Sequence, residues 1–147
     1  VCAVTPTDYS PADAVEAVTE FWSALGSRVV NLSAADHDAI CARTSHLPHV
    51  LASALVNAVL AKPRAVENNF LGTGFHDTTR LASGSPEMWR DIALDNAEAI
   101  AAALDELQAE VSDLKEALGA RDSAALEKFF AEGKKHRDDW IAGLENR

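Results

Sequence analysis

Three of the five histidines in this 147-residue sequence lie within the stretch Asp36–His49, together with Ser45 and Pro48. Residues three and four positions apart share one face of a helix, so Ser45, His46 and His49 can point the same way. An imidazole or a serine hydroxyl can both donate and accept hydrogen bonds. A helix that only packs against its neighbours has no need of this chemistry. We therefore interpret the stretch as the polar lining of a site.

Three kinds of site use such residues. A metal site would use His37, His46 and His49, but His37 is nine residues from His46 and the sequence has no His-Glu-x-x-His pattern. Nucleophilic catalysis by Ser45 would require a nucleophile elbow or oxyanion-hole glycines, which are absent near it. A pocket for a small polar molecule requires only the hydrogen-bonding groups, and we favour it. The structural alternative is that these residues satisfy one another inside a helix bundle.

Arg80 is the natural counterpart for an anionic ligand, because its segment Thr78–Ala82 carries no other charge. A guanidinium is a planar fork that can bind a carboxylate, with each charge-assisted hydrogen bond contributing about 1.5–3 kcal/mol. The alternative is a surface ion pair with Asp77, three residues earlier. Upstream, Gly72 and Gly74 predict a place where the backbone approaches another group closely.

The element that must position the histidines begins at Ser33. Ser33-Ala34-Ala35-Asp36 is a capping box, which predicts a helix from here to about Lys62. Pro48 has no N–H and its ring crowds the carbonyl of Thr44, so we expect a kink beside the polar residues. An apolar ridge with four-residue spacing should face the core, and its members are Leu47, Leu51, Leu55 and Val59.

The first 32 residues predict a strand, a helix and a second strand. Val1–Val4 is a short β-branched run, and Ser10 as N-cap begins a helix that Gly26 ends. Residues 27–32 follow as the second strand. This unit is too small to stand alone, so we expect it to complete a larger sheet. The sequence also begins without a methionine, and we expect it to be part of a longer protein.

Residues 33–147 predict an all-α domain built largely from small apolar residues. Residues 63–74 are expected to form a loop or broken helix, and Ser85 begins another helix in which Trp89 belongs to the core rather than to a ligand platform. Helical periodicity then continues to about Leu118 and ends at Gly119, and Asp122 caps a last helix that runs to about Leu144.

The charge balance limits the partners. A formal net charge of −10 and a pI near 4.8 argue against a nucleic-acid surface and against an anionic membrane. No apolar run approaches the ~20 residues of a membrane span. Cys2 and Cys41 have no metal-binding or redox spacing, so we expect reduced thiols in the cytoplasm.

Taken in order, several motifs resemble the prephenate and arogenate dehydrogenases. These motifs are His37-Asp38, Ser45-His46-Leu47-Pro48-His49, Gly74-Phe75-His76-Asp77-Thr78-Thr79-Arg80-Leu81-Ala82, and Pro86-Glu87-Met88-Trp89-Arg90-Asp91-Ile92 with Asn96. The resemblance spans nearly the whole chain. It implies a mainly α dimerisation domain, a helical bundle similar to the C-terminal domain of 6-phosphogluconate dehydrogenase. It also implies that residues 1–32 are the strand–helix–strand end of a dinucleotide-binding domain and that 33–147 bind substrate and dimerise.

The activity that the resemblance implies is the oxidative decarboxylation of prephenate to 4-hydroxyphenylpyruvate, or of arogenate to tyrosine, in tyrosine biosynthesis. NAD or NADP is then bound mainly by an N-terminal domain, which also carries the family's catalytic histidine. The 147 residues contain no Gly-x-Gly-x-x-Gly, so we expect this chain to be inactive by itself. The alternative from another class is a non-catalytic helical module that binds a ligand or dimerises.

The resemblance also assigns substrate-binding residues, which are Ser45, His46, His49, Arg80, Asp77 and Gly74. Arg80 is the carboxylate clamp, and Gly74 approaches the site from the partner subunit. His76 stands where relatives are expected to carry a basic residue. The expected partners are prephenate or arogenate, a second copy of the chain in a homodimer, and tyrosine as a candidate inhibitor. No nucleic acid or membrane is expected.

Overall fold

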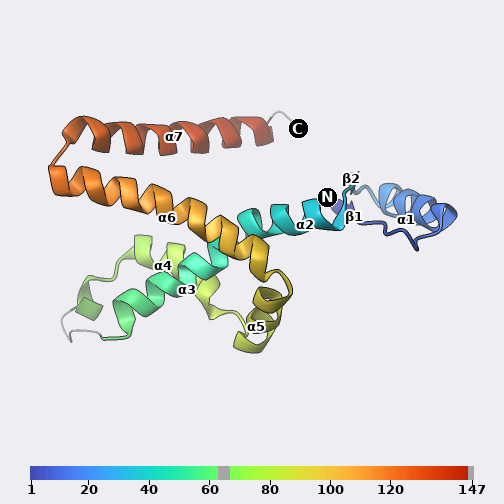
Figure 1. The fold of residues 1–147 in the computed structure, drawn as a ribbon, viewed down its shortest axis with the longest axis horizontal. Coiled ribbons are helices and arrows are strands. Elements are labelled where there is room, and N and C mark those ends of the chain that lie inside the picture. The colour runs from blue at the N-terminus through green and yellow to red at the C-terminus, as the bar shows by residue number, and fades with distance from the viewer. Residues whose placement is uncertain (63–66, 146–147) are drawn as a thin grey trace. The chain divides into compact units, whose positions relative to one another are not determined.

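A computed structural model describes residues 1–62 and 67–145 of the chain (Figure 1). These residues are mainly helical, which confirms the predicted fold class. The chain divides into two compact units, Val1–Ala103 and Leu104–Arg147. The division between these units lies after Ala103, whereas the predicted domain boundary lies between residues 32 and 33. The predicted boundary stays a prediction.

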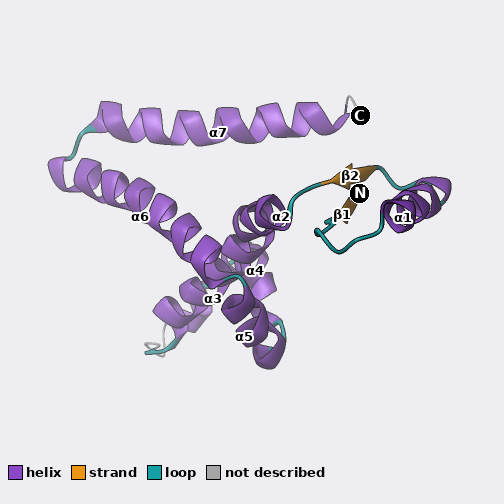
Figure 2. Ribbon diagram, turned by 45° about the vertical axis from the view of Figure 1, so that its right-hand side comes forward, coloured by secondary structure: helices purple, strands orange, loops and turns teal. Residues whose placement is uncertain are grey.

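The N-terminal segment is a parallel strand–helix–strand unit (Figure 2). Strands β1 (Cys2–Val4) and β2 (Val29–Asn31) pair in parallel, with Cys2 opposite Val29. Parallel neighbours require a crossover connection, and α1 (Ala12–Ala24) supplies it. The strand–helix–strand order predicted for residues 1–32 is therefore confirmed.

The two ends of α1 differ in how well they follow the prediction. Gly26 has φ of +81°, a left-handed conformation that only glycine adopts without cost, and it ends the helical segment as predicted. The predicted N-cap is wrong, because Pro11 rather than Ser10 occupies that position. The Ser10 hydroxyl instead accepts a hydrogen bond from the Thr7 N–H at 3.0 Å. It is therefore used in the turn before the helix.

The N-cap predicted at Ser33 is confirmed. The Ser33 hydroxyl accepts a hydrogen bond from the Asp36 N–H at 3.0 Å and donates to the Asp36 carboxylate at 2.7 Å. Such a cap typically contributes about 1 kcal/mol. The helix it opens is interrupted, however. It consists of α2 (Ala34–Cys41), a π-helical turn (Ala42–His46) and α3 (Leu47–Leu60).

The face of α3 that is buried is not the predicted one. Leu51 and Leu55 of the apolar ridge are each 37% exposed, whereas His49 and Ala52 are buried. The ridge was expected to face the core because it is the more apolar stripe. Within the described part of this single chain, the stripe that contains Ala42 and His49 faces inward instead.

Part of the loop predicted over residues 63–74 falls on residues 63–66, which lie outside the described residues. A short helical segment follows. It comprises a 3-10 turn (Glu67–Phe70), α4 (Thr73–Thr79) and a second 3-10 turn (Arg80–Ser83). Both α4 and the second 3-10 turn pack against α3. They therefore bring the Arg80 segment onto the histidine helix.

Two further helices complete the first unit. The Ser85 hydroxyl accepts a hydrogen bond from the Met88 N–H and caps α5 (Pro86–Asp95), as predicted. The periodicity predicted to continue from Leu94 is broken at Asn96, after which α6 (Ala97–Ala120) begins. Small side chains let these elements approach closely. Among the residues of this unit whose burial is described, the buried apolar ones are Ala42, Ala52, Ile100 and Ala103.

The second unit pairs the end of α6 with α7 (Ser123–Glu145). The predicted cap is confirmed, because the Asp122 carboxylate accepts hydrogen bonds from the Ala124 and Ala125 N–H groups at 3.0 Å. The predicted end at Gly119 is wrong. The helix continues to Ala120, and Arg121 takes the left-handed conformation, with φ of +52°.

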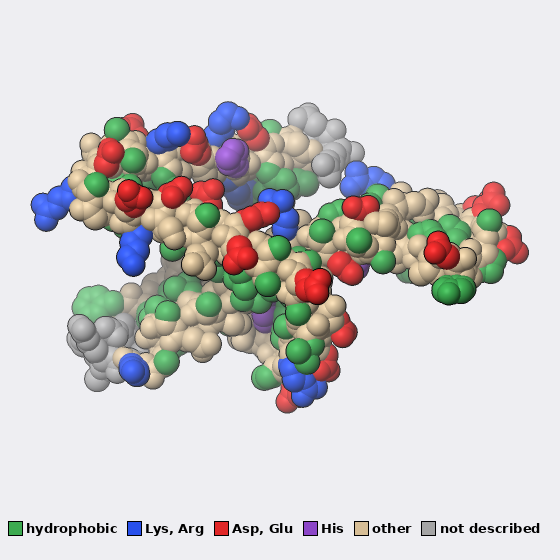
Figure 3. Space-filling model, viewed as in Figure 1, with side chains coloured by type: hydrophobic (Ala, Val, Ile, Leu, Met, Phe, Trp, Pro, Cys, Tyr) green, Lys and Arg blue, Asp and Glu red, His purple; other side chains and the backbone are tan. Residues whose placement is uncertain are grey.

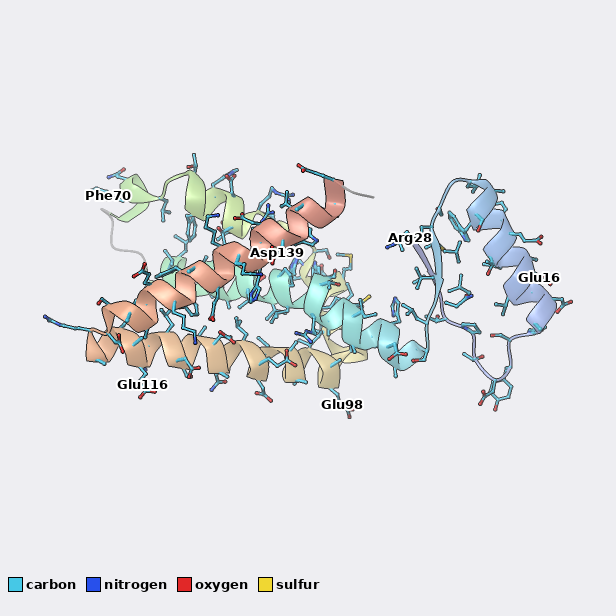
Figure 4. All side chains as sticks on the ribbon, turned by 90° about the horizontal axis from the view of Figure 1, so that it is seen from above. Glu16, Arg28, Phe70, Glu98, Glu116 and Asp139 are labelled. Atoms are coloured by element: carbon cyan, nitrogen blue, oxygen red, sulfur yellow. The ribbon has the colours of Figure 1, made fainter. Side chains whose placement is uncertain are left out.

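Charged side chains cover the exposed faces of the helices. Acidic groups are spread over α6 (Figure 3). Glu98 and Glu116 are about five helical turns apart and project from the same side of α6 (Figure 4). Such solvated faces agree with the interpretation of the charged C-terminal third as generic helix surface.

Candidate functional site

A π-helical turn lies where Pro48 was expected to kink the helix. Pro48 is in the first turn of α3, directly after the turn Ala42–His46. Proline cannot donate a backbone hydrogen bond and its ring crowds the preceding turn, so the backbone widens before it. The predicted local distortion is thus present as a π turn. It carries Ser45, which is exposed, and the half-buried His46.

His49 is the buried polar residue of the site, with only 8% of its surface exposed. Its ring stacks on the indole of Trp89, with centroids 3.5 Å apart and planes inclined by 14°. Burial lowers the pKa of His49 below its usual value of 6.5, because desolvation disfavours the charged imidazolium. His49 is therefore held as a neutral imidazole near neutral pH.

Trp89 has a different place from the one predicted. It was expected in the core rather than beside a ligand, but it is half-buried and forms one wall of a cavity. The ring of His46 meets it edge-on, with centroids 6.1 Å apart. Trp89 therefore organises both histidines of the Ser-His-Leu-Pro-His motif.

Gly84 is the glycine that allows close approach, and sequence reasoning missed it. A Cβ added there would lie 2.6 Å from Nε1 of Trp89 and 2.9 Å from Cε1 of His49. Around Gly72 and Gly74, no heavy atom of the described residues lies within 4 Å of such a Cβ. The described residues of this chain therefore make no close approach to Gly72 or Gly74, and an approach of Gly74 to a partner subunit stays a prediction. The sequence feature that could have indicated Gly84 is its position between the Arg80 motif and the Ser85 cap of α5.

A hydrogen-bond network ties His46 to two other elements. The Nδ2 atom of Asn96, at the break between α5 and α6, lies 2.8 Å from the Asp38 carbonyl oxygen in α2. The same atom lies 3.2 Å from Nδ1 of His46. Asn96 belongs to the family-like motifs, but it was not among the predicted site residues.

A cavity of about 630 Å³ adjoins His49. Its lining is mostly apolar and comes from α3, α5, α6 and the segment before α5, with Val50, Val56, Ala93 and Ile100 as typical members. This size and character are typical of small-molecule sites. Among the residues predicted to bind substrate, His49 is the one that lines it.

Arg80 begins the 3-10 turn that packs on α3. Its side chain is exposed, and no carboxylate of the described residues lies within ion-pair distance of it. Asp77 pairs instead with His76, with Nδ1 and Oδ1 3.2 Å apart and both side chains exposed. The alternative in which Asp77 neutralises Arg80 is therefore wrong.

The three histidines considered for a metal site make different contacts, although the rings of His46 and His49 both meet Trp89. His37 lies 3.0 Å from the Asp38 carboxylate and 3.4 Å from Sγ of Cys41. His46 contacts Asn96, and His49 stacks on Trp89. Among residues 1–62 and 67–145, no group of three potential metal ligands comes together. In the same residues, no helix is long and apolar enough to cross a bilayer.

The fold is a helical domain with a largely apolar cavity, attached to a parallel strand–helix–strand segment. Residues 33–132 match the family model described as the dimerization domain of prephenate dehydrogenase. This match covers more than half of the chain, and the chain belongs to the prephenate dehydrogenase family. The predicted family resemblance is thereby confirmed.

Curated relatives support the same assignment. The chain is 36% identical over 137 residues to a cyclohexadienyl dehydrogenase of Zymomonas mobilis, covering 91% of the chain and 47% of the relative. It is 31% identical to a prephenate dehydrogenase of Bacillus subtilis, covering 92% of the chain and 37% of that protein. The chain thus spans about half, or less, of the length of the relatives it matches.

Solved structures show the same fold. A prephenate dehydrogenase from A. aeolicus, in complex with hydroxyphenyl propionate and NAD⁺, matches with a TM-score of 0.86 and 31% identity, covering 93% of this chain and 49% of that one. A Synechocystis arogenate dehydrogenase matches with a TM-score of 0.84 and 25% identity, covering 94% of this chain and 51% of that one.

Proposed function

We propose that this chain is the substrate-binding and dimerisation part of an NAD(P)-dependent dehydrogenase that converts prephenate to 4-hydroxyphenylpyruvate. The observation that carries the proposal is the family match over residues 33–132. Relatives named for prephenate, cyclohexadienyl and arogenate substrates support this class of reaction. An arogenate-specific enzyme is the close alternative within the family.

The substrate-binding residues in this proposal are Ser45, His46, His49 and Arg80, with Asp77 and Gly74 beside them. Arg80 suits a carboxylate because its guanidinium has no acidic partner among the described residues, in a protein of net charge −10. A cation left unpaired on an acidic protein can bind an anion without first breaking an ion pair. Gly74, whose surroundings within the described part of this chain are open, is free to approach a partner subunit.

His49 connects the proposed polar residues with the cavity. Its neutral imidazole can donate or accept one hydrogen bond at each ring nitrogen. The stacked Trp89 and the adjacent Gly84 restrict how its ring can turn. We infer that His49 orients the substrate rather than balancing its charge, because burial favours the uncharged ring.

We infer that the residues of this chain contribute little to holding the coenzyme. The sequence has no Gly-x-Gly-x-x-Gly turn, and β1 connects to α1 through residues 5–11, which contain no glycine. We therefore propose that NAD or NADP, which would accept a hydride from the substrate, is bound mainly by an N-terminal domain of the full-length protein. The catalytic histidine belongs to the same domain in this proposal. The role of this chain is to bind and orient the substrate.

We further propose a homodimer formed through the helical domain. Within the first unit, Leu51 and Leu55 leave an apolar ridge of α3 partly exposed. Within the second unit, Phe130 is 64% exposed and Trp140 57% exposed. Apolar surface of this kind marks sites of association. The free thiols of Cys2 and Cys41 fit a reducing cytoplasm, and tyrosine is a candidate inhibitor because it shares the product's ring.

The test is an activity assay on the full-length protein. Prephenate and arogenate are each supplied with NAD⁺ or NADP⁺, and formation of the reduced nicotinamide is followed by its absorbance. We expect turnover with prephenate and a dimer in sedimentation at micromolar concentration. Absence of turnover with both substrates and both coenzymes would leave a non-catalytic helical module as the better account. A stable monomer would contradict the dimer.

A further inference from the structure

The side-chain amide of Asn96 has an orientation that the geometry decides. The oxygen and nitrogen of an asparagine amide are assigned from their partners. Here one partner is the Asp38 backbone carbonyl, which can only accept, 2.8 Å away. An amide oxygen facing it would place two acceptors in contact. The atom that faces Asp38 must therefore be the Asn96 nitrogen.

This orientation decides the proton position on His46. The same Asn96 nitrogen lies 3.2 Å from His46 Nδ1. An NH₂ group has two donors and no acceptor, so one N–H serves Asp38 and the other points to His46. A proton on Nδ1 would set two donors against each other. The Nδ1 atom is thus the acceptor, and the neutral ring carries its proton on Nε2.

The backbone around Asn96 fixes the amide in this place. The Asn96 N–H donates to the Ile92 carbonyl at 3.2 Å, and its own carbonyl accepts from the Ile100 N–H at 3.0 Å. The residue is therefore tied into both α5 and α6. On the other side, Trp89 meets the His46 ring edge-on. His46 is therefore held between the Asn96 amide and the Trp89 ring, which both lie more than forty residues after it in the sequence.

We propose that Asn96 is a positioning residue that locks His46 as its Nε2–H tautomer, so that His46 offers a hydrogen-bond donor to the anionic substrate. The role of His46 toward the substrate rests on the proposed function, whereas its tautomer follows from the contacts alone. An Nε2–H donor suits a carboxylate or a hydroxyl oxygen. The opposite tautomer would present a lone pair there and repel a carboxylate.

The direct test is NMR of the full-length protein with ¹⁵N-labelled histidine. The His46 signals are assigned by their loss in a His46→Gln variant. We expect an unprotonated, hydrogen-bonded Nδ1 and a protonated Nε2 in the parent protein. A proton found on Nδ1 at neutral pH would overturn the proposal without reference to activity.

An Asn96→Asp variant extends the test, because a carboxylate accepts where the amide donated. We expect the His46 proton to move to Nδ1 in this variant. Asn31→Asp, at an exposed position in β2, adds the same charge elsewhere and should leave the tautomer unchanged. An unchanged His46 in folded Asn96→Asp would also overturn the proposal. If this variant does not fold, the parent spectrum alone decides.

Kinetics separate this inference from the proposed function. Asn96→Leu removes the donor without adding charge. We therefore expect KM for prephenate to rise about tenfold, which is the effect of one lost hydrogen bond to a charged group. We expect kcat to stay within about twofold of the parent value. An unchanged KM would overturn the role toward substrate. If the parent protein shows no turnover but has the Nε2–H tautomer, the proposed function fails and the positioning by Asn96 stands.

Discussion

Gly84→Ala is the substitution for which the structure gives the clearest magnitude. Gly84 has φ of −68° and ψ of 162°, a conformation that alanine adopts freely, so backbone strain has no part in the effect. The added Cβ would lie 2.6 Å from Nε1 and 2.8 Å from Cδ1 of Trp89, and 2.9 Å from Cε1 of His49. Favourable carbon contacts lie at roughly 3.5–4.0 Å. The stacked rings must therefore move by several tenths of an ångström or more.

The expected cost is that of overpacking. Inserting a methyl group into a packed site typically costs about 1–3 kcal/mol. For a domain of this size, each kcal/mol lowers Tm by roughly 2–4 °C. We therefore expect Gly84→Ala to lower Tm by about 2–12 °C and to disturb the stack of His49 on Trp89.

The assay compares Gly84→Ala with Gly72→Ala in the full-length protein. Gly72 is the matched control, because its backbone is also extended, with φ of −88° and ψ of −173°, and no described heavy atom lies within 4 Å of the added Cβ. Thermal and urea unfolding report stability, and Trp89 fluorescence in a background with every other tryptophan, Trp22 and Trp140 included, changed to Phe reports the stack. Equal changes in Tm for the two variants, with unchanged Trp89 fluorescence, would refute the reasoning.

Three further outcomes are expected. Because burial lowers the pKa of His49, the unfolded state binds more protons than the folded state just below the ordinary value of 6.5, so stability should fall as pH drops through that region. Urea unfolding from pH 7.5 to about pH 5 should show this loss of stability in the parent protein and in a variant at the exposed His136, but a smaller loss in His49→Phe. If the free energy of unfolding falls with pH equally in all three proteins, the role given to His49 is contradicted. Ser33→Ala should lower the free energy of unfolding by about 1 kcal/mol by removing the α2 cap, and no change in the urea midpoint would count against the cap. Leu55→Lys should shift the sedimentation pattern toward monomer, whereas an unaltered dimer would place the interface elsewhere.

Features fixed by neighbouring residues could be predicted from the sequence. The caps at Ser33, Ser85 and Asp122 are confirmed, because each depends on a side chain and N–H groups two or three residues away. Gly26 is confirmed for the same reason, since a left-handed residue is needed where α1 ends. Ser10 fails because Thr7 competes for its hydroxyl, a choice between two local partners that the pattern does not resolve.

Features fixed by tertiary packing could not be predicted. Periodicity showed that Leu51 and Leu55 share an apolar face, but it does not say which element, or which chain, covers that face. For the same reason close approach was expected at Gly72 and Gly74 but is found at Gly84, because close approach depends on the partner in space rather than on glycine spacing. Arg121 rather than Gly119 ends α6, since non-glycine residues also reach the left-handed region in tight turns.

The candidate site shows the same division. The family-like motifs indicated His46, His49 and Arg80. In the structure, His46 contacts Asn96 and His49 stacks on Trp89. The positions of Gly84 and Asn96 depend on contacts between segments more than thirty residues apart, such as Asn96 with Asp38. Their roles became visible only in three dimensions.

The measurement that tests the central claim most directly is KM for prephenate in Arg80→Ala and Arg90→Ala variants of the full-length protein. Arg90 is the matched control, because it is an exposed arginine whose guanidinium pairs with Asp91 at 2.7 Å. If Arg80 clamps a substrate carboxylate, Arg80→Ala should raise KM about a hundredfold, the effect of losing a charge-assisted pair of hydrogen bonds. Arg90→Ala should leave KM unchanged. A KM that stays at the parent value in Arg80→Ala would contradict the account.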